Sequence, residues 1–321
     1  MSAATHDIIL LTGAGFTKNF DGFLAQEAWA RLFNNPQIQK TPKLKALLQN
    51  NFDFEVIYSE VFSNLEYSDI ERQTLSESLE KMYEDLDQTT NNWIFRDENP
   101  TAFNVYGMQE LIGLCVGTHA KKRMFFTLNQ DLLMERRYHH VPPGVSRFSQ
   151  DIYNSHASVK GKYVTLPDAT TLQKYIDTQF QSSSDLAYIK LHGSYGWHAV
   201  NGQNRMVIGK NKTSQIDEEP LLKWYFELFK NCLFEGGKKL LIIGYSFADP
   251  HINDVMTEAI QHAGLKLYII TPTKPQDIIK RIDPILWQAV SGYFGCSFRE
   301  LFPPDQSRTT MFSELCLALK T

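Results

Sequence analysis

Five short segments of the chain are predicted to be β-strands, because each is dominated by apolar residues without regular polar alternation. Such runs are typical of strands buried on both faces, as in the parallel sheet of an α/β protein. The predicted strands are residues 8–11, 123–127, 186–191, 239–243 and 266–270. Helical patterns fill most of the intervals between them, so we predict an α/β fold with a Rossmann-like, doubly wound and mainly parallel sheet.

The predicted helices are unevenly distributed, with a long helical stretch after the first strand. Helices are expected at residues 24–33, 44–49, 54–62, 70–86, 104–115 and 221–234, and residues 284–319 are expected to be mainly helix. Pro36, Pro42 and Pro100 break the pattern. Asp249 and Pro250 favour the start of a further helix, with Asp249 as its cap.

We expect these elements to form one domain over residues 1–321. It would contain a helical insertion at about 41–118 and a loop-rich segment at about 142–184, where Pro, Gly, Ser and Asn are abundant. Residues 197–208 favour a hairpin around Asn201-Gly202.

Every predicted strand ends in small or polar residues. The clusters are Gly13-Ala14-Gly15, Asn129-x-Asp131, His192-Gly193-Ser194, Gly244-Tyr245-Ser246 and Thr271-Pro272-Thr273. Because the carboxyl ends of parallel strands meet at one edge of a sheet, where ligands bind, these clusters should line one crevice. We expect its lining to include Gly13, Gly15, Asn129, Asp131, His192 and Ser246.

The first cluster is a glycine turn between a strand and a helix. Gly13 and Gly15 lack a Cβ, so the backbone can approach a phosphate closely, and the following helix would direct free N–H groups at it. Glycines in such turns also serve purely steric roles, and that alternative stays open. Lys18 replaces the third glycine of the dehydrogenase fingerprint and the acidic strand end is missing, so hydride carriage is not expected.

Composition narrows the class of protein further. The net charge of −4 gives no reason to expect direct nucleic-acid binding, and no apolar run is long enough to span a membrane. The four cysteines, Cys115, Cys232, Cys296 and Cys316, form no Cys-x-x-Cys pair, which argues against a zinc knuckle. With no signal-like N-terminus, we expect a cytoplasmic protein.

The helical insertion is strongly acidic. Residues 51–99 contain 13 acidic and three basic side chains, although the whole chain has a net charge of only −4. One interpretation is a solvated helical face. The other is a surface that packs against another protomer or a basic partner protein, since the segment is too long to be a mere connection.

Taken in order, the strand-end motifs resemble those of the sirtuin family, and more closely its divergent bacterial branch that destroys NAD during antiphage defence. The matching motifs are the phosphate loop Gly13-Ala14-Gly15, the Thr127-x-Asn129-x-Asp131 motif, the catalytic His192-Gly193 and the Gly244-Tyr245-Ser246 turn. They extend from residue 13 to residue 246, which is most of the chain.

The resemblance implies that NAD+ is a substrate whose nicotinamide is released, with no metal involved. His192 would be the base, Asn129 would orient the water or the ribose, and Asp131 would bind the nicotinamide amide or fix the turn. The residues that would hold ribose and pyrophosphate are Gly13, Ala14, Gly15, Phe16, Thr17, Thr127, Gly244 and Ser246. Taken alone, His192 would fit a structural turn, and Asn129 with Asp131 would fit a helix start.

The chain also departs from the family pattern. The two cysteine pairs that hold zinc in sirtuin deacylases are missing, Phe20-Asp21-Gly22-Phe23-Leu24 replaces an Ile-Pro-Asp-Phe-Arg run, and Leu128 replaces a glutamine. These departures favour an NAD+ glycohydrolase over a protein deacylase. A binding module that senses NAD or ADP-ribose without turnover is the main alternative.

The resemblance further implies that something else triggers the enzyme. Expected partners are a HerA-like ring ATPase, a short Argonaute or further copies of the chain in a homo-oligomer, without direct nucleic-acid or membrane binding. The motifs do not distinguish hydrolysis from cyclisation of the ADP-ribose product, because both follow the same bond cleavage.

Overall fold

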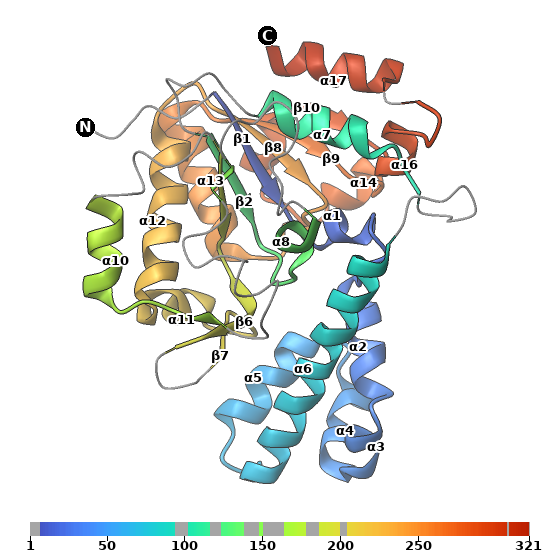
Figure 1. Cartoon of the computed structure of the whole chain (residues 1–321), viewed down its shortest axis with the longest axis vertical. Coiled ribbons are helices and arrows are strands. Elements are labelled where there is room, and N and C mark those ends of the chain that lie inside the picture. The colour runs from blue at the N-terminus through green and yellow to red at the C-terminus, as the bar shows by residue number, and fades with distance from the viewer. Residues whose placement is uncertain are drawn as a thin grey trace.

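A computed structural model describes residues 7–93, 102–115, 123–137, 148–149, 164–177, 186–199, 204–306 and 308–320. At its centre lies a parallel sheet of seven strands in the order β10-β9-β8-β1-β2-β5-β3 (Figure 1). The strands are β1 (Ile8–Thr12), β2 (Arg123–Thr127), β3 (Phe148–Ser149), β5 (Leu186–Lys190), β8 (Lys239–Ile243), β9 (Lys266–Ile270) and β10 (Val290–Phe294). The predicted doubly wound, Rossmann-like α/β fold is therefore confirmed.

The central strands are apolar throughout because both faces of the sheet are covered. Leu10 pairs in register with Phe125 on one side and with Leu241 on the other, and all three side chains are buried in the same core cluster. That face is covered by α7 (Val105–Leu114) and α17 (Thr310–Lys320). The opposite face packs against α12 (Pro220–Phe234) and α13 (Pro250–Ala263).

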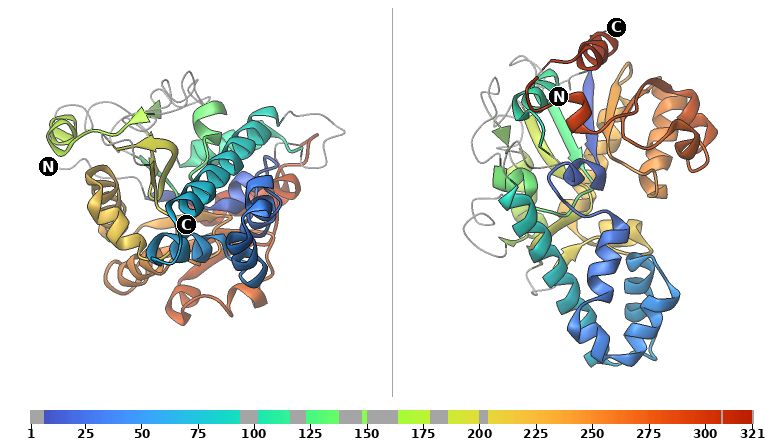
Figure 2. Two further views of the ribbon diagram at one scale, coloured as in Figure 1. Left: turned by 90° about the horizontal axis from the view of Figure 1, so that it is seen from below. Right: turned by 90° about the vertical axis from the view of Figure 1, so that its right-hand side faces the viewer.

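Residues 25–92, within the chain between β1 and β2, form a helical lobe beyond one edge of the sheet (Figure 2). After the short α1 (Ala14–Lys18), its helices are α2 (Ala25–Phe33), α3 (Pro36–Lys40), α4 (Pro42–Asn50), α5 (Phe54–Ser63) and α6 (Asp69–Asn92). Pro36 and Pro42 each occupy the first helical turn, where a missing N–H costs nothing. The lobe has its own core, with Leu44, Ile57 and Leu79 among its buried residues.

A second, three-stranded sheet contains β4 (Val164–Thr165), β6 (Gly193–His198) and β7 (Asn204–Met206). β6 and β7 pair antiparallel, as a hairpin requires, and the expected turn at Asn201-Gly202 lies outside the described residues. Within the predicted loop-rich segment, the structure describes β3, β4 and α10 (Ala169–Tyr175). The rest of residues 142–184, apart from residues 166–168 and 176–177, lies outside the described residues.

The prediction that residues 284–319 are mainly helix is wrong in one part, because β10 lies within them. β10 is an edge strand that pairs only with β9, and its residues are partly exposed, so it lacks the apolar run of a central strand. Its helical neighbours are α14 (Pro275–Ile278), α15 (Pro284–Gln288) and α16 (Phe298–Leu301). The other helices in the described part of the chain are α8 (Leu133–Arg137) and α11 (Lys212–Glu218).

None of the described helices combines the length and the apolar character that crossing a membrane requires.

Candidate functional site

The carboxyl ends of β1 and β8 are joined through their glycine turns. From β1 the chain continues to β2 on one side and later returns to β8 on the other, so this is the topological switch point of the sheet. The Gly13 amide donates to the Ile243 carbonyl at 3.0 Å, and the Gly15 amide donates to the Gly244 carbonyl at 2.9 Å. A Cβ on Gly15 would lie 2.7 Å from the Gly244 Cα. The glycines therefore let two backbones pack against each other.

The glycine turn has fewer free backbone N–H groups for a ligand than its motif predicts. Besides Gly13 and Gly15, Phe16 also uses its amide internally, donating to the Gly13 carbonyl at 2.8 Å. The Phe16 ring packs edge-on against Phe125 in the core. Ala14 is the exposed residue of the turn, and Ser246, beyond Gly244, is exposed as well. The side chains of Ala14 and Ser246 therefore lie at the surface of the two joined loops.

The motif at the end of β2 is bound to α1 by a buried polar network. The Asn129 amide nitrogen donates to the Gly13 carbonyl at 2.9 Å and to the Thr17 Oγ1 at 2.8 Å. The Thr17 hydroxyl in turn donates to the Asp131 carboxylate at 2.7 Å. Thr127 accepts from the Asn129 backbone amide at 3.1 Å. Thr17, Thr127 and Asp131 thus hold Asn129 in place. Both hydrogen bonds of the Asn129 side chain are donated by its Nδ2 atom.

Asp131 also begins α8, since its carboxylate accepts from the Leu133 amide at 2.9 Å. Beneath it, the buried Lys190 donates to the Asp131 carbonyl, to Glu135 at 2.8 Å and to Ser194 at 2.8 Å. Burial raises the pKa of Glu135, while Lys190 acts in the opposite direction. Through its hydrogen bonds to Thr17 and to the Leu133 amide, the Asp131 carboxylate stabilises the turn after β2. Fixing this turn is one of the two roles that the resemblance implies.

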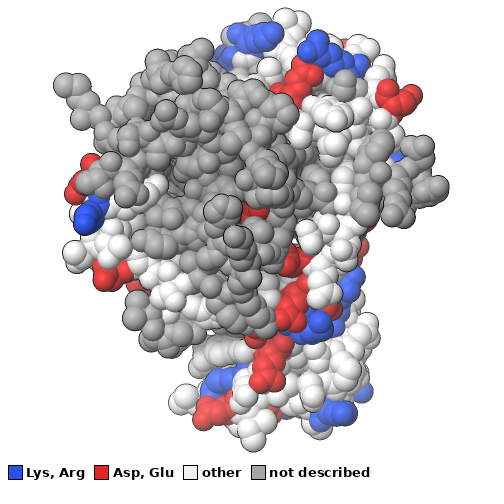
Figure 3. Space-filling model, viewed as in Figure 1, with Lys and Arg blue, Asp and Glu red and all other residues white. Residues whose placement is uncertain are grey.

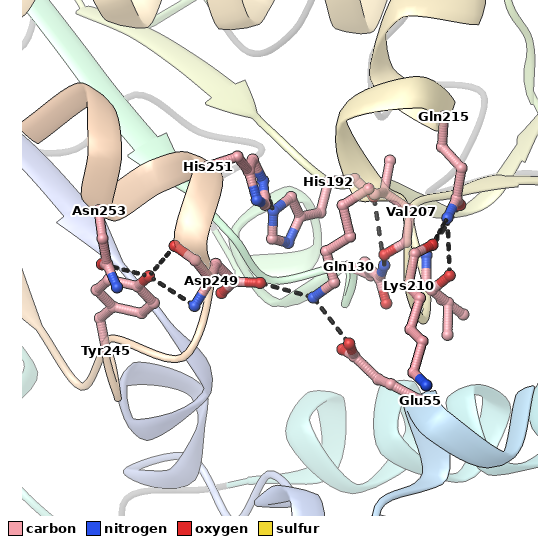
Figure 4. Close-up of polar contacts among 12 residues, drawn as sticks. Glu55, Gln130, His192, Val207, Lys210, Gln215, Tyr245, Asp249, His251 and Asn253 are labelled. Atoms are coloured by element: carbon pink, nitrogen blue, oxygen red, sulfur yellow. Dashed lines mark hydrogen bonds and ion pairs between the residues drawn. The ribbon is translucent and has the colours of Figure 1, made fainter. Parts of the chain in front are cut away.

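His192 lies just beyond β5, beside the Asn129 turn. Its carbonyl accepts from the Val207 amide at 2.9 Å and from the Gln130 side chain at 3.3 Å, which fixes the backbone (Figure 4). The side chain is 4% exposed, and burial lowers its pKa to about 3. The imidazole is therefore neutral near neutral pH, as a proton acceptor must be.

The His192 ring contacts a second histidine, which lies outside the strand-end motifs. Its Nε2 lies 3.0 Å from the Nε2 of His251, on the first turn of α13. Burial also lowers the pKa of His251. Figure 4 shows the two rings facing each other, with Asp249 nearby on the same segment as His251.

Asp249 does more than begin a helix, so its interpretation as a cap is corrected. Its side chain makes no capping bond, and one carboxylate oxygen lies 2.6 Å from the Lys212 Nζ. Lys212 also contacts Glu55 of α5 at 2.8 Å. Although burial acts against its charge, Asp249 and Glu55 raise the pKa of Lys212. An ionic chain thus connects the helical lobe to the His192 site.

Among the described residues, His192, Asp249 and His251 are the group whose geometry could hold a metal, since one ligand atom from each lies within 4.8 Å of the others. Two imidazoles and a carboxylate suit a transition metal. However, the Lys212 ammonium already neutralises Asp249 and would repel a second cation. The geometry favours the histidine hydrogen bond over a metal centre.

The strand-end motifs located the main-chain positions of the site but missed three side chains. His251 and Asp249 stand in the Asp249-Pro250-His251 run, in which Asp249 and Pro250 carry only the signal of a helix start. Lys212 follows no strand and belongs to no motif, so the sequence carries no signal for it.

Together, the sheet and its edge define an α/β protein of the doubly wound class, in which ligands generally bind at the switch point, here between β1 and β8. Comparison with protein families identifies this class more closely, because the model for the SIR2-like domain matches residues 123–291. The chain belongs to the SIR2-like family. SIR2-like domains use NAD+, so the match indicates an NAD-related function. A search of curated proteins finds no match.

Proposed function

We propose that the protein is an NAD+ glycohydrolase that releases nicotinamide and ADP-ribose. The observation that supports this most directly is the position of Asn129 and His192. They follow the neighbouring strands β2 and β5, which pair in register at Thr127 and Lys190, beside the switch point. A neutral imidazole and a fixed amide at this edge suit a reaction at a ribose.

The reaction needs a base more than an acid, because the leaving nicotinamide of NAD+ already carries positive charge. The bond between the ribose C1′ and nicotinamide breaks, and its electron pair leaves with nicotinamide as a neutral base. A water oxygen forms the new bond to C1′ while His192 accepts the proton from that water or from a ribose hydroxyl. The proton then passes to solvent, so NAD+ and water give nicotinamide, ADP-ribose and one proton.

The other motif residues divide into ligand-facing and supporting positions in this proposal. Ala14 and Ser246, which are exposed, would contact the ribose and pyrophosphate. Thr17, Thr127 and Asp131 would act through Asn129, whose position their hydrogen bonds fix.

Purified protein incubated with NAD+, alone and with proteins encoded beside it, tests the proposal when nicotinamide is followed by chromatography. We expect turnover that Asn129→Ala and His192→Ala both abolish. His262→Ala is the matched control, since His262 is an exposed histidine on α13. Tight binding of intact NAD+ without nicotinamide release under any of these conditions would refute turnover and favour a sensing module.

We further propose that the enzyme depletes NAD as an effector of antiphage defence and that the helical lobe carries its contact with a partner or a second copy. Figure 3 shows acidic side chains gathered where α6 runs. The α5–α6 turn also exposes Leu65 (94%) and the first turn of α6 exposes Ile70 (75%), beside the acidic Glu66 and Asp69. Exposed apolar residues rimmed by charge are typical of protein interfaces.

Light scattering of the purified chain, with and without the neighbouring proteins, tests this surface. We expect Leu65→Glu together with Ile70→Glu to abolish the larger assembly while leaving the folded chain intact. An assembly that survives these changes would place the contact elsewhere.

A further inference from the structure

The contact between His192 and His251 restricts where their protons can lie. Because burial lowers the pKa of both rings, both are neutral near neutral pH, and each carries one N–H. A hydrogen bond between two Nε2 atoms 3.0 Å apart requires one of them to donate and the other to accept. Two arrangements satisfy this condition.

The two arrangements have opposite consequences for the base. If His251 donates, the Nε2 lone pair of His192 is occupied and its remaining nitrogen, Nδ1, carries the proton. His192 could then accept nothing from a substrate. If His192 donates, its proton is on Nε2 and its Nδ1 lone pair is available.

We propose that His251 is the positioning residue of the His192 base: it accepts the Nε2 proton of His192 and so reserves the Nδ1 lone pair for the water or ribose hydroxyl. This inference rests on the proposed glycohydrolase function. When Nδ1 takes up a proton, His192 becomes an imidazolium that still donates through Nε2 to His251, so the contact is kept throughout the step.

The surroundings of His251 suit this role because they fix the start of its helix and place an aromatic ring beside its imidazole. Pro250 fixes the first turn of α13, and Asn253, one turn later, donates to the Phe247 carbonyl at 2.8 Å. The Phe226 ring lies 5.8 Å from the His251 ring between centroids. The negative charge of Asp249 favours the protonated form of both imidazoles and therefore stabilises the imidazolium formed during the step.

Kinetics of two variants separate positioning from simple packing. His251→Phe keeps a ring but removes the acceptor, and we expect kcat to fall by about 10²-fold or more with little change in KM. His251→Gln retains a side-chain oxygen that can accept, and we expect it to restore part of the lost kcat. His262→Phe on the same helix is the control and should leave kcat unchanged. Equal losses of kcat in the Phe and Gln variants would overturn the proposal.

Nitrogen-15 NMR of the labelled histidine rings tests the same inference without turnover. The His192 resonances, assigned with His192→Ala, should show the Nε2–H tautomer in the wild type and lose that preference in His251→Phe. A wild-type His192 protonated on Nδ1 would refute the proposal. Because the tautomer is measured without NAD+, a protein that shows this tautomer but never releases nicotinamide would refute the glycohydrolase function alone.

Discussion

Replacing Gly244 with alanine tests whether the close approach of two glycine turns holds the switch point together. Gly244 has φ +64°, and a Cβ there would lie 2.4 Å from the Gly15 carbonyl carbon and the Phe16 nitrogen. The left-handed conformation costs alanine about 1–2 kcal/mol. Carbon contacts normally lie at about 3.5 Å, so the turns must also separate by about 1 Å. Such overpacking costs about 1–3 kcal/mol, which gives a total loss of about 2–5 kcal/mol.

Gly264→Ala separates the two contributions. Gly264 has φ +69° at the end of α13, but a Cβ there would meet nothing within 4 Å, so only the conformational cost of about 1–2 kcal/mol applies. For a chain of 321 residues, 1 kcal/mol corresponds to a Tm shift of about 1.5 °C. Thermal unfolding followed by circular dichroism should therefore place the Tm of Gly244→Ala about 1.5–4.5 °C below that of Gly264→Ala. Equal Tm values would show that the backbone contact between the turns contributes nothing.

Three further outcomes are expected from the same structure. Thr17→Val removes the hydroxyl between Asn129 and the buried Asp131, and should lower the free energy of unfolding by about 1–3 kcal/mol in urea titrations. Lys190→Met leaves the buried Glu135 without its cation and should cost about 3–5 kcal/mol, whereas adding Glu135→Leu should recover most of that loss; a double variant as unstable as the single one would contradict this. Acidification from pH 6.5 to pH 5 should lower the free energy of unfolding by about 1.7 kcal/mol through His192, because the unfolded ring (pKa 6.5) binds a proton that the folded ring (pKa about 3) does not. The contribution is complete above pH 6.5 and is lost as the pH falls towards 3, so urea midpoints should vary less with pH in His192→Gln than in the wild type.

The fold could be predicted because its central strands have no solvent face. Residues in β1 and β8 are buried on both sides of the sheet, which forces a continuous apolar run that the sequence displays directly. The edge strand β10 has no such requirement, and Val290 and Tyr293 are only partly buried. Strand pairing, rather than composition, makes it a strand. β10 forms because it pairs with β9, and the local sequence of residues 290–294 carries no signal of that pairing.

The site could be predicted only where it coincides with the ends of strands. Asn129 and His192 follow apolar runs, and the topology of a parallel sheet brings such positions to one edge. Lys212 reaches the same edge from a short helix, and Glu55 reaches it from the helical lobe. Their approach depends on how separate segments pack, so single-sequence patterns carry no trace of it.

The chain of contacts around His192 connects its proton chemistry to the position of the helical lobe. Moving α5 away would remove Glu55 from Lys212 and leave the ammonium paired with Asp249 alone. Glu55 and Asp249 both raise the pKa of Lys212, whereas Lys212 lowers the pKa of His192 and His251. The lobe therefore acts on the two imidazoles electrostatically, through the ion pairs Glu55–Lys212 and Lys212–Asp249. A partner bound to the exposed α5–α6 turn would bear on the same helix, α5, that carries Glu55, and so would have a physical route to His192, the proposed base.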